Sequence, residues 1–224
     1  MVRRECDSAG HAALLRSVKR ICRTRLGFSR AMPPRVFQQQ LTRYGYPARM
    51  NLATIPTFAG GDIFHVVVES PRGSALKLKH NIEWDVMSVA RPLPVGVMFP
   101  YDWGFVPSTE AADGDPLDAM LLWDVASYPG VVIPCRAVGV LEVEQNRQRD
   151  DSSRRIRNDR IMAVPVEARR EREVNEVTRL PARVRQEVEQ FTLAATALEG
   201  KQVRVLGWSD AAAALQLVRE TSRR

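Results

Sequence analysis

Short runs of alternating apolar and polar residues, separated by turns that contain glycine and proline, fill the chain from about residue 60 to residue 166. Runs of this length with many β-branched residues are typical of strands, and a succession of them indicates a barrel or a sandwich. The pattern predicts strands at residues 63–69, 75–80, 84–90, 95–99, 117–125, 131–144 and 160–166. We therefore expect a mainly β core.

Helical periodicity begins only near the C-terminal end. Apolar residues there recur at the spacing of one helical face, at Val184, Val188, Phe191, Ala195 and Leu198. Pro181 suits the first turn of this helix, and Gly200 suits its end. A closing strand is expected at residues 203–206, followed by a last helix for which Asp210 supplies the N-cap. The predicted class is therefore mainly β (α+β), with helices at the C-terminal end.

The formal charge of +7 is not spread evenly along the chain. Residues 1–49 hold 11 lysines and arginines but only 2 acids, whereas residues 50–224 hold 22 basic and 24 acidic side chains. We therefore divide the chain into a basic N-terminal extension at 1–49, disordered or partly helical, and a domain at 50–224. The extension is expected to be a tail or a stretch translated upstream of Met50, and a targeting segment or a contact with an anionic partner is the alternative.

Cysteine usage and apolar run length indicate the compartment. Cys6, Cys22 and Cys135 are odd in number and widely spaced, which argues against a disulfide framework and for a reducing environment. The longest apolar runs are far too short to span a bilayer, and no segment has the pattern of a secretory signal. We therefore expect a cytoplasmic protein with no membrane partner.

The stretch DGDPLD places three carboxylates, Asp113, Asp115 and Asp118, within six residues. Gly114 and Pro116 are turn formers, so the stretch by itself favours a polar turn. Three carboxylates this close repel one another, however, and a hard divalent cation offsets that repulsion. Oxygen ligands suit magnesium or manganese better than zinc. A metal site is therefore the alternative to a simple turn.

Basic residues precede the acids on two of the predicted strands. Lys77, Lys79 and Arg91 each have the simple interpretation of a solvated strand face. Together with the acids, however, they complement a polyanion, because cations and metal ions clamp phosphate groups while an Asp-bound water attacks. The chain has no Walker loop, dinucleotide-binding GxGxxG, GxSxG elbow or HExxH motif.

Six segments carry a resemblance to a known family. They are VVVESPRGSALK, FPYDWGFVPST, EAADGDPLDAMLL, PGVVIPCRAVGVLEVEQ, RNDRIMAVP and LEGKQVRVLGW, in this order between residues 66 and 208. From about Met50 to Glu220 the chain resembles the soluble, magnesium-dependent inorganic pyrophosphatases (inorganic diphosphatases), as a divergent member. The resemblance implies an OB-like closed β-barrel of five or more strands flanked by C-terminal helices. It also implies hydrolysis of pyrophosphate to two phosphates in the cytoplasm by a homo-oligomer.

The resemblance implies metal ligands among the acids. Asp113 and Asp118 would hold Mg²⁺, with Mn²⁺ as the alternative, and Asp118 would be shared between two ions. Asp115 would be a ligand and also the base that helps to deprotonate the metal-bound water. Glu69 would orient that water, and Asp159 would be a further ligand.

The resemblance also implies cations that bind phosphate. Lys77 and Arg91 would bind the phosphoryl oxygens of pyrophosphate, and we assign Lys79 and Arg160 to the same role. Lys79 stands where the family has an acid. Lys79 and Arg160 therefore add positive charge near the substrate, where it would replace a metal ion electrostatically.

Other positions depart from the family's pattern. They are Phe99 and Trp103 for two tyrosines, Gln145 and Asn146 for an acid pair, Asn158 for an acid, and Ala195 and Thr196 for a tyrosine–lysine pair. The alternative function is therefore a catalytically weakened relative that binds a phosphate-containing ligand or a partner without turnover. A nucleic-acid-binding OB barrel is discounted, because the barrel segment is nearly neutral and its aromatic residues cluster only in FPYDWGF.

Overall fold

The computed structural model describes residues 51–146 and 155–223, so the predicted extension at 1–49 lies outside the described residues. The strands of the described part are β1 (Phe58–Gly60), β2 (Ile63–Ser70), β3 (Leu76–Asn81), β4 (Val86–Pro92), β5 (Asp102–Phe105), β6 (Asp118–Leu121), β7 (Val132–Asn146), β8 (Arg155–Arg157), β9 (Arg160–Pro165) and β10 (Arg204–Ser209). Its helices are η1 (Leu52–Thr54), η2 (Val177–Arg179), α3 (Ala182–Thr196) and α4 (Ala211–Thr221). None of these helices is long and apolar enough to cross a membrane.

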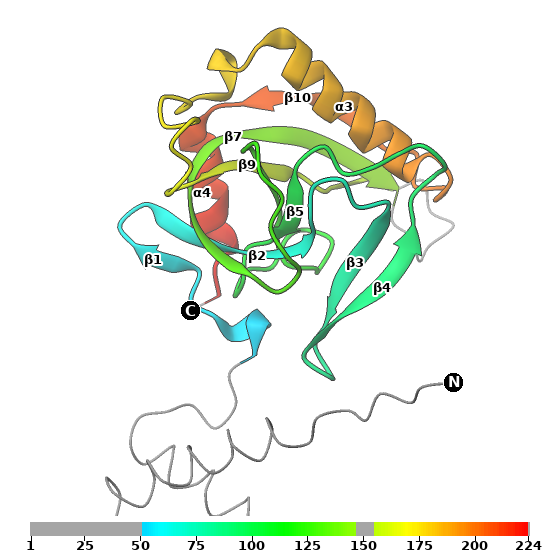
Figure 1. Ribbon diagram of the computed structural model, residues 1–224, viewed down its shortest axis with the longest axis horizontal. Coiled ribbons are helices and arrows are strands. Elements are labelled where there is room, and N and C mark those ends of the chain that lie inside the picture. Colours follow the sequence, from blue (N-terminus) through cyan, green and yellow to red (C-terminus); the bar gives the residue numbers. More distant parts are fainter. Residues whose placement is uncertain (1–50, 147–154, 224) are drawn as a thin grey trace, which may run out of the picture. The chain divides into compact units, whose positions relative to one another are not determined.

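Five of the strands close into a ring. β2 pairs with β5, β5 with β6, β6 with β9 and β9 with β7, and β7 returns to β2. The β6–β9 pair is parallel, whereas the other neighbours are antiparallel. Figure 1 shows this ring, with β10 added beside β7. A five-stranded closed barrel of this kind is an OB-like fold, so the predicted architecture is confirmed.

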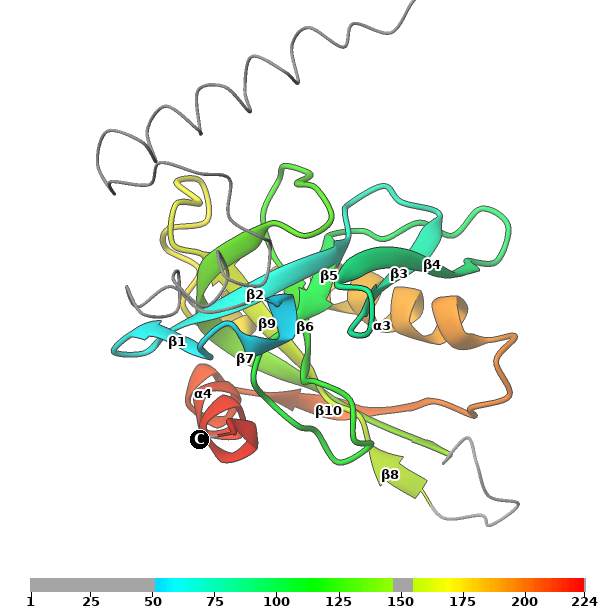
Figure 2. The same cartoon turned by 90° about the horizontal axis from the view of Figure 1, so that it is seen from below.

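The two faces of the barrel sheet build two buried clusters, because successive strand residues point to opposite faces. Ala119 and Leu121 of β6 share a cluster with Val218 of α4. Met120, which lies between them in the chain, belongs to the other cluster, together with Val188 of α3. The two helices accordingly cover different sides of the ring, as the two views in Figures 1 and 2 show. The C-terminal flanking helices were predicted, and Asp210 caps α4 by accepting a hydrogen bond from the Ala213 amide at 2.8 Å.

The β3–β4 hairpin forms a separate two-stranded sheet beside the barrel. Its register places Lys77 of β3 opposite Arg91 of β4. Two side chains at the end of β2 hold β3 in place. Ser70 accepts a hydrogen bond from the Leu78 amide at 2.9 Å, and Glu69 accepts one from the His80 amide at 2.8 Å. The basic residues of the hairpin are thereby fixed next to the acidic end of β2.

The strand predicted at residues 95–99 is wrong. The Val97 amide donates to the Pro94 carbonyl at 2.9 Å, and Gly96 has a φ of +84°, so the chain turns there. The next strand, β5, was not predicted, because DWGF has neither an apolar run nor regular alternation. Its position depends on Gly104, where a Cβ would lie 2.0 Å from the Val67 carbonyl oxygen. Only glycine therefore permits the observed approach of β5 to β2.

Candidate active site

The acidic stretch DGDPLD is a tight turn that leads directly into β6. Asp113 accepts a hydrogen bond from the Asp115 amide at 3.2 Å, and the Ala111 amide donates to the Asp115 carbonyl at 2.8 Å. Gly114 has a φ of +87°, a conformation that glycine adopts without a steric penalty. Asp118 is the first residue of β6. The polar turn predicted for this stretch is therefore present, and the metal site on it stays a prediction.

Arg160 forms a buried ion pair with Asp118. The two residues are Cα partners in the parallel register of β6 and β9, so the sheet itself sets them side by side. One guanidinium nitrogen lies 2.6 Å from an Asp118 oxygen, and the Arg160 side chain is only 7% exposed. The same nitrogen donates to the Asn158 side chain, and the guanidinium lies 5.1 Å from the centre of the Trp103 ring. Contacts on three sides therefore fix this cation.

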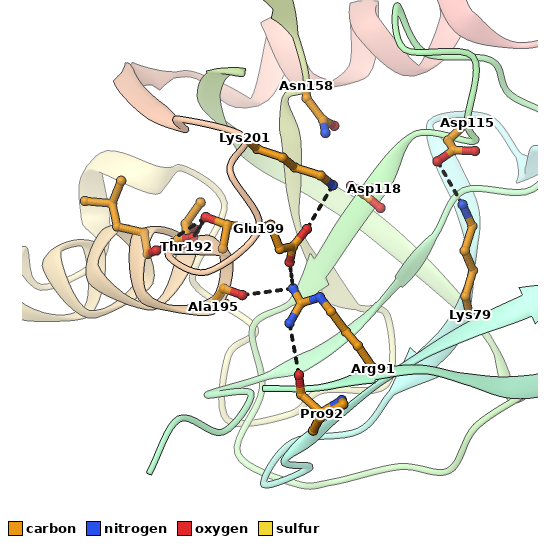
Figure 3. Close-up of polar contacts among 12 residues, drawn as sticks. Lys79, Arg91, Pro92, Asp115, Asp118, Asn158, Thr192, Ala195, Glu199 and Lys201 are labelled. Carbon is orange, nitrogen blue, oxygen red and sulfur yellow. Dashed lines mark hydrogen bonds and ion pairs between the residues drawn. The ribbon is translucent and has the colours of Figure 1, made fainter. Parts of the chain in front are cut away.

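Lys79 forms a second ion pair, with Asp115. Its Nζ lies 2.8 Å from an Asp115 oxygen, and both side chains are about half exposed. Burial opposes the charge of Lys79, but the hydrogen bond and charge of Asp115 raise its pKa above the ordinary value. Figure 3 shows this pair apart from the contacts that Arg91 makes with Ala195 and Glu199. Two carboxylates of the acidic turn are therefore each matched by a lysine or an arginine.

Lys77 is a partly buried lysine of the site. Its Nζ lies 5.9 Å from the centre of the Trp103 ring. Burial lowers the pKa of Lys77, and the positive charge of Arg160 lowers it further, whereas Asp118 raises it. Sequence reasoning treated Trp103 only as a lost tyrosine. In the structure its ring lies close to two of the predicted phosphate-binding cations, Lys77 and Arg160.

Glu69 is a buried carboxyl at the end of β2. It is only 5% exposed and accepts the His80 amide hydrogen bond. The pKa of Glu69 is raised to about 7, mainly by burial, and the negative charge of Asp118 contributes to this rise. Burial also raises the pKa of Asp113, with repulsion from Asp118 and Asp115 acting in the same direction. Repulsion between carboxyl groups is therefore present in the site.

Arg91 closes the other side of the site (Figure 3). It donates to the Ala195 carbonyl at the end of α3 at 2.8 Å and forms an ion pair with Glu199. Lys201 lies 3.1 Å from Glu199 and is 18% exposed. Burial lowers the pKa of Lys201, and so does the charge of Arg160, whereas Asp118 raises it.

Glu199 and Lys201 were missed as site residues. The segment LEGKQVRVLGW carried the resemblance, but no motif singled out a lysine that follows the glycine at the end of a helix. The two residues lie just after the helix on which the tyrosine–lysine pair was expected. A backbone carbonyl and an ion pair therefore occupy a region where side-chain donors were expected.

Asp159 is engaged away from the acidic turn. It accepts hydrogen bonds from the Val143 amide at 2.9 Å and from Arg157, whose nitrogen lies 3.0 Å away. Its assignment as a metal ligand stays a prediction. The buried Asp102 of FPYDWGF has a structural role instead, since it accepts hydrogen bonds from the Arg72 amide at 2.7 Å and the Trp123 indole at 3.0 Å.

The donor set of the acidic turn fits a hard cation. Asp113, Asp115 and Asp118 offer oxygen ligands only, which suits Mg²⁺ or Mn²⁺. Within residues 51–146 and 155–223, no three Asp, Glu, His or Cys side chains lie close enough together to hold a metal ion as they stand. The fit therefore rests on the chemistry of the donors, and two of the three are paired with cations.

Comparisons with known proteins identify the family of this chain. A family model described as inorganic pyrophosphatase matches residues 66–224, which include every candidate residue named above. The inorganic pyrophosphatase of Thermus thermophilus is 36% identical over 173 residues, or 75% of this chain and 94% of that protein. The inorganic pyrophosphatase of Synechocystis sp. is 34% identical over 171 residues, or 76% of this chain and 96% of that protein.

Solved structures give the same answer for the fold. The crystal structure of inorganic pyrophosphatase from Thermus thermophilus matches with a TM-score of 0.70 at 34% identity, covering 77% of this chain and 97% of the other. An inorganic pyrophosphatase structure from Coxiella burnetii matches with a TM-score of 0.67 at 30% identity, covering 75% and 97%. The sequence and structure comparisons both cover about three quarters of the chain, and this chain belongs to the inorganic pyrophosphatase family.

Proposed function

We propose that this protein hydrolyses inorganic pyrophosphate to two phosphates, with Mg²⁺ as its metal and Mn²⁺ as the alternative. The observation that carries the proposal is a single site, in a member of the pyrophosphatase family, where basic side chains surround an acidic turn. A polyanion with two charged phosphoryl groups complements both the basic side chains and the acidic turn, because the cations bind its oxygens while the carboxylates hold metal.

The acids would bind the metal and accept the proton of the attacking water. Asp113, Asp115 and Asp118 would be the ligands, with Asp159 as a further candidate. A divalent cation supplies Lewis acidity and neutralises phosphate charge. Asp115 would accept the proton of the attacking water. Glu69, with its pKa raised to about 7 by burial, would orient that water by hydrogen bonding and hold a proton near neutral pH.

The cations would bind and orient the substrate. Lys77, Arg91, Lys79 and Arg160 are the predicted phosphate-binding residues, and Lys201 joins them because it lies beside the Arg91–Glu199 pair. Their positive charge would stabilise the charge that develops on the leaving phosphate. Burial lowers the pKa of Lys77, and the dianionic groups of a bound substrate would raise it again.

The test is phosphate release from pyrophosphate by the full chain, with Mg²⁺, with Mn²⁺ and with neither. Asp118→Asn is the matched control, since it keeps the shape of the side chain and removes its charge. We expect metal-dependent release that falls by about a hundredfold or more in the variant. Equal release by the two proteins, or none from either, would rule out the proposed hydrolysis.

The second candidate function is binding of a phosphate-containing ligand or a partner without turnover. It is favoured by the Arg91–Ala195 contact, in a region where a tyrosine and a lysine were expected to donate to phosphate. Calorimetry with pyrophosphate and Mg²⁺, followed by a phosphate assay over hours, separates the two. Tight binding with no released phosphate supports this candidate, and rapid turnover excludes it.

We also propose a cytoplasmic location, a homo-oligomer and a division between residues 1–49 and 50–224. The family resemblance supports the first two. The family match supports the third, because it starts at residue 66 and thus lies within the proposed domain. Exposed apolar residues on the β3–β4 hairpin, among them Ile82, Trp84 and Val89, are suitable for a contact between copies. Light scattering of the full chain and of a 50–224 form would show the mass of each, and a monomer in both cases would contradict the homo-oligomer.

A further inference from the structure

The carboxylates of the site are already neutralised by the chain's own cations. Four acidic side chains form a connected group, because the charge of Asp118 acts on Glu69 and Asp113, and the charge of Asp115 also acts on Asp113. Four basic side chains, Lys77, Lys79, Arg160 and Lys201, act on the same group of acids. A divalent cation that enters this site alone therefore meets a cluster with little net negative charge, and its electrostatic attraction is correspondingly small.

Two of these cations contact the carboxylates directly. Lys79 lies 2.8 Å from Asp115, and Arg160 lies 2.6 Å from Asp118. An oxygen that accepts a charge-assisted hydrogen bond from an ammonium or guanidinium group is a poorer metal ligand, because the two positive charges compete for it. Both contacts must therefore loosen before these oxygens can bind a metal fully.

A phosphate ligand would loosen both contacts at once. Ammonium and guanidinium groups bind phosphoryl oxygens as readily as carboxylates. The Lys79–Asp115 pair is about half exposed, so its ammonium group can change partners with little cost in burial. Each cation that turns from a carboxylate to a phosphate returns one negative charge to the acidic turn.

We propose that Lys79 and Arg160 act as built-in cations that exchange partners, from Asp115 and Asp118 in the free protein to phosphoryl oxygens in the complex. Metal affinity is then low in the free protein and rises when the polyanion is bound. By thermodynamic linkage, metal raises the affinity for the polyanion by the same factor. The proposal rests on the proposed function for the identity of the ligand, and it adds the role of Lys79 as a residue that sets metal affinity.

The experiment measures each ligand alone, on the full chain, without turnover. Mn²⁺ binding is followed by the electron paramagnetic resonance signal of the free ion. Methylenediphosphonate, a diphosphate mimic that cannot be hydrolysed, is titrated by calorimetry in the presence of a chelator. The variants are Lys79→Glu, which places a carboxylate beside Asp115, and Lys79→Met, which removes only the charge.

The two ligands should respond in opposite directions. In Lys79→Glu we expect Mn²⁺ to bind about tenfold more tightly than in the unaltered protein, and metal-free diphosphonate to bind about tenfold more weakly. Lys79→Met should move both affinities in the same directions by smaller factors. The matched control is Arg219→Glu, an equal charge change on α4, whose partner is Asp62. Helix α4 lies on the far side of the barrel from the β3–β4 hairpin (Figures 1 and 2), so this variant should change neither affinity.

Two outcomes overturn the proposal. One is an unaltered protein that binds Mn²⁺ alone as tightly as Lys79→Glu does. The other is a diphosphonate affinity that is the same in all three proteins. Phosphate release from pyrophosphate is measured separately on the same preparations. Opposite affinity changes without release would refute only the hydrolysis, whereas release without these changes would refute only the exchange of partners.

Discussion

The two ion pairs of the acidic turn use the same chemistry in different surroundings. The Arg160–Asp118 pair joins neighbouring strands of the closed barrel, and its side chains are 7% and 23% exposed. The Lys79–Asp115 pair joins a hairpin to a turn, and its side chains are 48% and 60% exposed. Exposed pairs contribute little to stability, whereas a buried charge that loses its partner is costly. The first pair should therefore contribute more to the stability of the fold, and the second should exchange partners at a lower cost.

The largest effect should follow removal of the enclosed cation. In Arg160→Met, Asp118 keeps its charge and loses its partner, so we expect the free energy of unfolding to fall by about 3 kcal/mol. Urea unfolding of the metal-free protein measures this. Arg157→Met is the matched control, an arginine on β8 that is about half exposed, and it should cost less than about 1 kcal/mol. Equal losses in the two variants would remove the distinction between enclosed and exposed pairs.

Glu69 extends the comparison of buried and exposed charges to a buried carboxyl that accepts a hydrogen bond from a backbone amide. Its pKa is about 7 in the folded protein and near 4.5 when unfolded, so the folded state retains the proton to higher pH. Stability is therefore greatest below about pH 4.5 and is lost as pH rises toward about 7, with little change above.

The expected loss between pH 5 and pH 8 is about 2 to 3 kcal/mol, as calculated from the two pKa values. Urea unfolding of the metal-free protein at the two pH values measures it. Glu69→Gln, which cannot ionise, serves as the reference and should lack this loss. A loss of the same size in both proteins would mean that other groups cause the pH dependence.

Lys201 is intermediate in exposure between Arg160 and Lys79, since its side chain is 18% exposed. Its partner Glu199 is shared with Arg91. If Lys201 binds substrate, Lys201→Met should lower kcat/KM for pyrophosphate about tenfold, which corresponds to about 1.4 kcal/mol. Lys201→Arg keeps the charge and should retain most of the activity. Steady-state phosphate release measures kcat/KM for both variants. Equal kcat/KM in both variants would show that the charge of Lys201 is not used.

The smallest effect on stability should come from the exposed pair. Lys79→Met should change the free energy of unfolding by less than about 0.5 kcal/mol, and added salt should reduce even this difference. Urea unfolding at low and high ionic strength measures both quantities. A loss comparable to that of Arg160→Met would mean that Lys79 is a structural residue and not one available to ligands.

The barrel could be predicted from the sequence, but its pairing could not. Alternating apolar residues gave most of the strands, and the resemblance gave the closed OB-like barrel. The parallel register that joins Asp118 to Arg160 depends on contacts between strands far apart in the chain, and no local pattern encodes it. β5 was not predicted for a related reason. The need for glycine at position 104 comes from the Val67 carbonyl on a neighbouring strand, and not from adjacent residues in the sequence.

Most residues of the candidate site could be named from the sequence, but the ion pairs that they form could not. The structure brings Lys77, Lys79 and Arg160 to the acidic turn, as the sequence analysis expected. It also brings Glu199 and Lys201, which lie in a loop without a motif of its own. Long side chains from a loop can reach a site from many backbone positions, so spacing along the chain gave no signal for them.

The parallel register of β6 and β9 also bears on how the protein is made. During synthesis Asp118 is added to the chain before Arg160, so it begins without its partner. Because side chains alternate along a strand, a slip of one residue between β6 and β9 would turn Arg160 to the opposite face. The same docking event therefore closes the barrel and completes the site. A chain that misfolds at this step would carry all the site residues and still lack the site.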